Sequence, residues 1–245
     1  MSARPENTLA AAREFYRQQL AESFRYSRQF SEPRGNVAGA VVDTLEFEAV
    51  LRECAAGSFD CARRIGEMAV VHLDKTPLLA AWPKETEGAA NATRPGPGDW
   101  WRDLLNFERC CFLQAVTTAQ GPPANRPRRG PSAVCTNFSW AISEVVERIR
   151  TGRTIDESLR RTLTLLFART HEGRVSVVEV GADIEKVFRA TNGLRTVEQI
   201  AAAAGLNLEE TNEILAALAS IGAIVPAMSS EEMSRLISAR EISSK

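Results

Sequence analysis

The feature that most restricts the fold of this chain is the run of residues 161–226, where strand, helix and stop signals follow one another closely. Two apolar, β-branched segments, 163–170 and 175–180, flank the tetrapeptide His-Glu-Gly-Arg at 171–174. A glycine between two such segments is typical of a β-hairpin. The sequence therefore predicts a hairpin whose second strand is 175–180.

Three short helical segments follow the hairpin. Gly193 suits the left-handed residue that ends the first of them. Capping-box patterns open the second and third, at Thr196-x-x-Gln199 and Asn207-x-x-Glu210. A hairpin followed by three helices predicts a winged-helix-like unit, and such a unit binds either DNA or a peptide.

The charges of this region favour a peptide. Residues 175–226 contain three basic and seven acidic residues, a formal charge of −4. The third helix carries Glu209, Glu210 and Glu213 and has no Lys or Arg. Contacts to DNA phosphates require cations, so this helix is poorly suited to the major groove. An open strand edge can instead accept an extended peptide as an additional strand.

Three segments of this region resemble the PqqD-like peptide-recognition domain. They are Val-Ser-Val-Val-Glu-Val at 175–180, the stretch 184–201, and Leu-Ala-Ser-Ile-Gly-Ala-Ile-Val-Pro at 218–226. The piece Asn-Gly-Leu-Arg-Thr-Val-Glu-Gln-Ile at 192–200 is similar to the most recurrent part of that domain. The resemblance implies that a leader peptide adds to the strand and lies against the third helix. Carried over by position, the peptide-binding residues are Val175, Ser176, Val177, Val178, Glu179, Val180, Glu210, Glu213, Ile214 and Ala217.

Two segments farther upstream, 99–109 and 134–152, resemble TglI-type proteins. These are partner subunits of multinuclear non-heme iron enzymes that modify peptide cysteines. After the phenylalanine at 138 that family often has acidic or Tyr-Asp residues, whereas this chain has Ser139-Trp140. The resemblance implies two partners: a TglH-type enzyme that holds the iron, and a ribosomal carrier peptide whose terminal cysteine enters 3-thiaglutamate biosynthesis.

The sequence itself predicts no catalytic residue and no metal site in this chain. There are two histidines, His72 and His171, and none of the five cysteines forms a pair with the spacing of a zinc knuckle. A metal site of this kind needs about three protein ligands. Nucleophile-elbow and phosphate-loop patterns are also missing from the sequence. We therefore expect no cofactor here and iron only in the partner.

The rest of the chain reads as mostly helical. Helices are expected over 8–30, 44–56, 58–73, 99–119 and 141–150, with a turn at 33–39, a loop at 82–98, a basic connector at 121–131 and an extended step at 133–138. The predicted fold class is α+β and mostly helical. The predicted domains are a helical partner-docking domain (1–152), a winged-helix-like PqqD-type domain of a hairpin and three helices (153–227), and a helical tail (228–245).

Two further groups are candidates for partner binding. Trp100 and Trp101 could anchor an interface, or could simply begin a buried helix. Arg126, Arg128 and Arg129 in the basic connector could bind an anionic partner, or could belong to a solvated loop. For the predicted peptide edge, the alternative is that residues 134–138 cover it.

Composition excludes some partners and locations. The net charge is −1, which gives the chain no general attraction to nucleic acid or anionic lipid. No apolar run approaches the roughly 20 residues that span a bilayer. The N-terminal residues do not resemble a signal peptide, so we expect a cytoplasmic protein. The alternatives to a peptide-binding subunit are a winged-helix DNA-binding regulator with a ligand-sensing N-terminal half, and an enzyme with its own metal.

Overall fold

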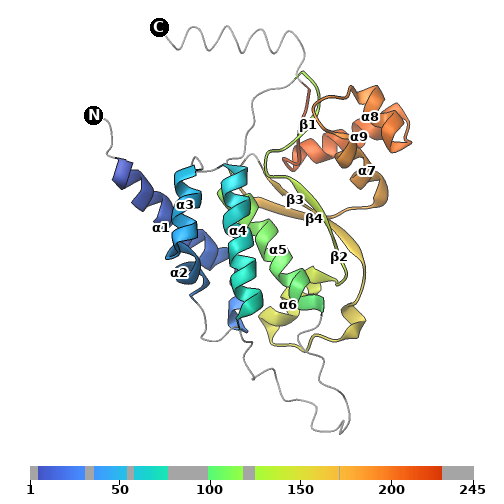
Figure 1. The fold of residues 1–245 in the computed structure, drawn as a ribbon. Helices are drawn as coiled ribbons and strands as arrows, with labels where there is room; N and C mark the ends of the chain where they lie inside the picture. Colours follow the sequence, from blue (N-terminus) through green and yellow to red (C-terminus); the bar gives the residue numbers. More distant parts are fainter. Residues whose placement is uncertain are drawn as a thin grey trace. The chain divides into compact units, whose positions relative to one another are not determined.

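The protein is built mainly of α-helices, with two small sheets that contain antiparallel strand pairs, in the computed structural model drawn in Figure 1. The structure describes residues 5–30, 36–53, 58–76, 99–117, 125–170 and 172–227. The expected class, α+β and mostly helical, is confirmed at this level. None of the helices in these ranges combines the length and the apolar character needed to cross a membrane.

The chain divides into two compact units, and it passes between them three times. The first unit comprises residues 1–117 and 137–163, and the second comprises 118–136 and 164–245. The sequence predicted a division after residue 152 and a separate tail at 228–245, which lies outside the described residues. The division differs because residues 128–129 pair with residues 224–225, so the expected connector belongs to the second unit.

The first unit is a bundle of helices around an aromatic core. Its elements are α1 (Pro5–Ser23), η1 (Ser27–Gln29), α2 (Val37–Val42), α3 (Leu45–Glu53), α4 (Phe59–Lys75), α5 (Asp99–Val116), α6 (Ile142–Thr151) and η2 (Glu157–Leu159). Helix α5 contacts α1, α4, α6 and η1. The ring of its Phe112 lies 6.3 Å from that of Tyr16 and 6.2 Å from that of Phe24, and all three are fully buried. Helix α5 is thus the element around which this unit packs.

Two local predictions for this unit differ from the structure. The described part of the turn expected at 33–39, residues 36–39, instead opens α2, because the Asn36 side chain accepts a hydrogen bond from Gly39 N at 2.8 Å. The helix expected over 8–30 ends at Ser23, and the chain then turns into η1.

The second unit contains the predicted hairpin and three helices. Its helices are α7 (Ala182–Ala190), α8 (Val197–Ala204) and α9 (Leu208–Ser220). Its strands are β1 (Arg128–Arg129), β4 (Val175–Glu179), β5 (Ile224–Val225) and most of β2 (Val134–Phe138) and β3 (Leu163–Arg169), whose residues 137–138 and 163 fall in the first unit. Strands β2, β3 and β4 form one sheet in that order, and β1 pairs with β5 in the other. Gly173, with a φ of 83°, lies in the turn between β3 and β4.

One aliphatic core joins the sheet to the helices of this unit. Leu166 and Ala168 of β3 pack in the same buried cluster as residues of α7, α8 and α9. Both predicted capping boxes are present: the Thr196 side chain accepts from Gln199 N, and the Asn207 side chain accepts from Glu210 N. The hairpin and the caps therefore lie where their sequence signals predict. Gly193 is left-handed, with a φ of 82°, but α7 ends two residues earlier at the C-cap Thr191, and the Gly193 N–H bonds to Pro127 O instead of to the helix.

Candidate functional site

Strand β4 lies at the edge of its sheet. It pairs with β3 in an antiparallel register that places Leu166 opposite Val178 and Phe167 opposite Val177. No described strand pairs with its other side. Strand β2, the segment that the sequence suggested might cover this edge, pairs with β3 instead. Among the described residues the outer side of β4 is therefore open.

The hydrogen-bonding pattern shows which backbone groups face that open side. Val180 N donates to Thr164 O at 2.9 Å, and Thr170 N donates to Arg174 O at 2.8 Å. In an antiparallel pair, hydrogen-bonded and non-hydrogen-bonded positions alternate. Ser176 and Val178 are thus bonded to β3, whereas the N–H and C=O groups of Val175 and Val177 point outward.

The side chains of β4 are unusually apolar for an edge. Val175 and Val178 lie on opposite faces of the strand and remain 39% and 38% exposed. Edge strands are commonly protected by Lys, Pro or a bulge. The sequence Val-Ser-Val-Val-Glu of β4 contains neither Lys nor Pro, and its register with β3 runs without a bulge. An edge of this kind is suited to a guest strand.

Helix α9 supplies the other predicted peptide contacts. Glu210, Glu213 and Ala217 are exposed, and Ile214 is half-buried against the aliphatic core. The main packing contacts of α9 are with α7, α8 and β5 rather than with β4. The fold places both halves of the predicted site on one unit without packing α9 closely against the strand. Whether these residues bind a peptide remains a prediction.

The arginines of the expected connector hold the second unit together. Arg126 donates to Leu194 O, and Arg129 Nε donates to Thr191 O at 3.1 Å. Arg128 forms a β-bridge with Asn192. Pro127 O also accepts from Gly193 N at 3.0 Å. These residues contact the turn before α8, although Arg126 and Arg129 remain exposed to solvent. Their binding to a partner stays a prediction.

Trp100 and Trp101 lie at the start of α5 in the first unit. They are only 8% and 4% exposed, and the ring of Phe30 lies 6.1 Å from one and 6.4 Å from the other. This placement fits the alternative of a buried helix start. Neither side chain offers the accessible surface that an interface anchor requires.

Two carboxylates of α5 have roles that sequence reasoning missed. Asp103 Oδ2 accepts from Ser139 N at 2.7 Å and from Trp140 N at 3.0 Å. Glu108, which is 1% exposed, accepts from Tyr26 N at 2.7 Å and from Ser27 N at 3.2 Å. Both carboxylates thus hold turns that are distant in the sequence.

Burial raises the pKa of Glu108 from 4.5 to about 7, against hydrogen bonds from Ser27 and Tyr26 and the charge of Arg25, which lower it. A sequence signal existed: Glu108 stands between Leu104 and Phe112 at helical spacing, on the apolar face of α5. A carboxylate on such a face needs donors within the fold, and here they are backbone N–H groups.

The described residues offer little for metal or nucleophilic chemistry. No group of three or more His, Cys, Asp and Glu lies close enough to hold a metal ion within these ranges. Burial raises the pKa of Cys110 to about 11, of Cys111 to about 12 and of Cys135 to about 11. At neutral pH these thiols are protonated and weakly nucleophilic. His171 and Cys54 lie outside the described residues.

Comparison with known proteins adds no identification. The sequence matches no protein-family model and no curated protein.

Proposed function

We propose that this protein is a non-catalytic subunit that binds an extended peptide along β4 and presents it to a partner enzyme. The observation that carries the proposal is the open edge of β4, with the outward N–H and C=O groups of Val175 and Val177 and two exposed valines. Main-chain hydrogen bonds along such an edge provide affinity, and pockets for alternate side chains provide selectivity.

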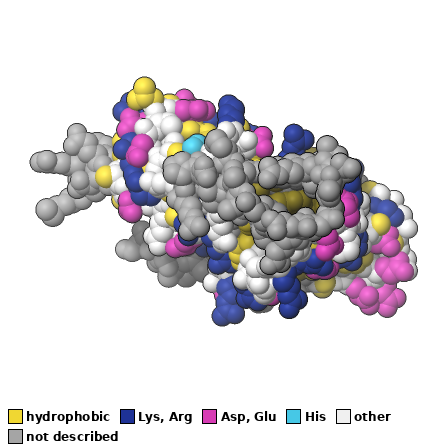
Figure 2. Space-filling view, turned by 90° about the horizontal axis from the view of Figure 1, so that it is seen from below, with side chains coloured by type: hydrophobic (Ala, Val, Ile, Leu, Met, Phe, Trp, Pro, Cys, Tyr) yellow, Lys and Arg dark blue, Asp and Glu magenta, His cyan; other side chains and the backbone are white. Residues whose placement is uncertain are grey.

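The charges of α9 support a guest that carries Lys or Arg. Helix α9 has three exposed glutamates, Glu209, Glu210 and Glu213, and no basic residue. Figure 2 shows acidic side chains gathered at the right-hand edge of that view, the side on which Figure 1 draws α7–α9. A cationic leader would be attracted to this surface over roughly one Debye length, about 8 Å at physiological salt.

The resemblance to PqqD-like domains and TglI-type subunits supports a more specific role. In this role the guest is the leader of a ribosomally made carrier peptide that ends in cysteine. The partner is a multinuclear iron oxygenase of the TglH type, acting in the cytoplasm on the route to 3-thiaglutamate. The catalytic residues and the iron belong to that enzyme, and this chain contributes neither.

In this proposal the subunit acts by positioning. A leader held on β4 keeps the reactive cysteine near the enzyme at an effective concentration on the order of millimolar, if the intervening segment is short and flexible. The first unit would dock the enzyme. Since Trp100 and Trp101 are buried, docking would use exposed apolar side chains of the helices, such as Leu45 and Val71.

The decisive experiment replaces an outward backbone donor. Val177→Pro removes an N–H that faces the open side and leaves the ladder to β3 intact, so the fold should persist. Fluorescein-labelled peptides encoded beside this gene would be titrated with wild-type and variant chains, and binding followed by fluorescence anisotropy. We expect the variant to bind at least about tenfold more weakly.

Val178→Pro is the matched control. Its N–H is bonded to β3, so the substitution should destabilise the unit itself by about 3 kcal/mol. If Val177→Pro keeps both wild-type stability and wild-type affinity for a peptide that binds, the peptide does not add to β4 and the proposal is wrong.

DNA binding is a second candidate, favoured by one observation. Helices α8 and α9 are joined by a three-residue turn that begins with Gly205, as in a helix-turn-helix. The described part of the second unit has eight basic and eight acidic residues and is therefore neutral, unlike the anionic stretch 175–226. Helix α9 has no Lys or Arg, which still argues against its binding in the major groove of DNA. Mobility-shift assays at several salt concentrations separate the two functions, because DNA binding weakens steeply with salt.

A further inference from the structure

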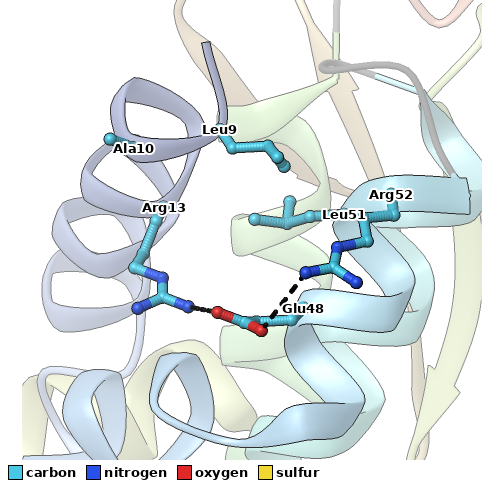
Figure 3. Close-up of a pocket in the computed structure, with 6 residues that line it drawn as sticks. All are labelled: Leu9, Ala10, Arg13, Glu48, Leu51 and Arg52. Carbon is cyan, nitrogen blue, oxygen red and sulfur yellow. Dashed lines mark hydrogen bonds and ion pairs between the residues drawn. The ribbon is translucent and has the colours of Figure 1, made fainter. Parts of the chain in front are cut away.

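The first unit contains a pocket that the proposed function does not use. It opens between α1 and α3 and has a volume of about 280 Å³. Its described lining consists of Leu9, Ala10 and Arg13 from α1, and of Glu48, Leu51 and Arg52 from α3 (Figure 3).

The two ends of this pocket differ in chemistry. At one end Leu9 and Leu51 point toward one another from the two helices (Figure 3). At the other end Arg13 donates to Glu48 Oε1, and Arg52 approaches the same carboxylate from the opposite side. An apolar wall therefore stands beside a cluster of two guanidinium groups and one carboxylate.

The cationic end is not neutralised by Glu48. Two arginines share one carboxylate, so the three groups together carry a charge of +1. The distance from Arg52 Nη2 to Glu48 Oε2 is 3.8 Å, too long for a hydrogen bond, and the Arg52 side chain is 70% exposed. A guanidinium has five N–H donors, so Arg52 keeps donors that a second carboxylate can use.

From this arrangement we infer that the pocket binds a small aliphatic carboxylate. The carboxylate of the ligand accepts hydrogen bonds from Arg52 and Arg13, and its tail covers Leu9 and Leu51. The volume is at the lower limit of small-molecule pockets, roughly 300 Å³ and above, so a short branched tail fits better than a long chain. A probe with these properties is 4-methylpentanoate.

The test is an NMR titration of the full ¹⁵N-labelled chain with 4-methylpentanoate at pH 7. We expect shifts confined to the amides of the lining residues and a dissociation constant on the order of 1 mM, as is usual for so small a ligand. The matched neutral probe, 4-methylpentanamide, should shift the same amides at least about tenfold more weakly.

A pair of variants tests the role of the guanidinium. Arg52→Gln should weaken the binding of 4-methylpentanoate by about tenfold or more. Arg63→Gln on α4 removes an arginine that is also exposed and paired with a glutamate four residues away, and it should leave binding unchanged. Equal affinity for the acid and the amide, no shifts with the acid, or wild-type affinity in Arg52→Gln would each overturn the inference.

Discussion

The two units of this chain are stabilised in different ways. The first packs large aromatic side chains around α5 and holds its turns with carboxylates from distant positions in the sequence. The second has a core cluster of Val, Leu, Ile, Ala and Phe188, and it opens α8 and α9 with caps from neighbouring residues. The starts of α8 and α9 are thus specified by neighbouring residues, whereas the turns at Tyr26–Ser27 and Ser139–Trp140 of the first unit depend on side chains that are distant in the sequence.

The largest effect should come from the aromatic core of the first unit. Phe112→Ala removes a fully buried ring that packs against Tyr16 and Phe24, and should lower the free energy of unfolding by about 3–5 kcal/mol. Chemical denaturation followed by circular dichroism measures this loss. Phe15→Ala is the control: its ring is 41% exposed, so its loss should stay near 1 kcal/mol. If the two variants lost the same free energy of unfolding, the core of the first unit would not depend on Phe112.

A glycine of the second unit should be nearly as sensitive. Gly222 has a φ of 76°, and a Cβ at this position would lie 2.1 Å from Arg169 O. Gly222→Ala should cost about 2–4 kcal/mol, because backbone strain and a clash with backbone add together. Gly205, with a φ of 72°, has no atom within 4 Å of an added Cβ, so Gly205→Ala should cost only about 1 kcal/mol. Thermal unfolding of both variants measures these losses. Equal losses of unfolding free energy in the two variants would contradict the prediction.

The buried carboxylate of the first unit should make stability depend on pH. Burial raises the pKa of Glu108 in the folded chain from 4.5 to about 7. The stability linked to this group is complete below pH 4.5 and is lost as the pH rises through 7. Between pH 6 and pH 8 the free energy of unfolding should fall by about 1.4 kcal/mol. Urea titrations at several pH values measure this slope.

Glu108→Gln isolates the contribution of that carboxylate. Glutamine retains an oxygen acceptor for Tyr26 N and Ser27 N but does not titrate. The difference in pH slope between wild type and variant therefore belongs to Glu108. Identical slopes would show that Glu108 does not change its protonation state on folding.

The smallest effect should come from a local cap of the second unit. Thr196→Ala removes the acceptor for Gln199 N at the start of α8 and should cost about 1 kcal/mol. Thr196→Ser keeps a hydroxyl there and should restore most of the stability. If Thr196→Ala lowered the free energy of unfolding as much as Phe112→Ala does, Thr196 would have a role beyond capping α8.

These differences explain which parts of the fold could be predicted from the sequence. The hairpin turn at Gly173 and the caps at Thr196 and Asn207 are encoded within a few residues, and all were predicted. The partners of Glu108 are 81 and 82 positions away, and no local pattern indicates them. The pairing of β1 with β5 was also missed, because the two strands are distant in the sequence and a two-residue strand has no periodicity to detect.

The candidate site was also predictable only in part. The strand was located from its β-branched residues, and an edge position was expected from its place before the helices. The outward direction of the Val177 N–H could not be predicted, because it depends on which residue pairs of β3 and β4 are hydrogen-bonded. The structure distinguishes these neighbouring positions, since the Val177 N–H faces outward and the Val178 N–H is bonded to β3.

The pairing of β1 with β5 also has a consequence during synthesis on the ribosome. Strands β1 and β2 leave the exit tunnel long before β5, with residues 137–163 of the first unit made in between. The second unit cannot be completed until nearly all of the described chain has emerged. Until then β1 lacks its strand partner, so this two-stranded sheet forms only at the end of synthesis.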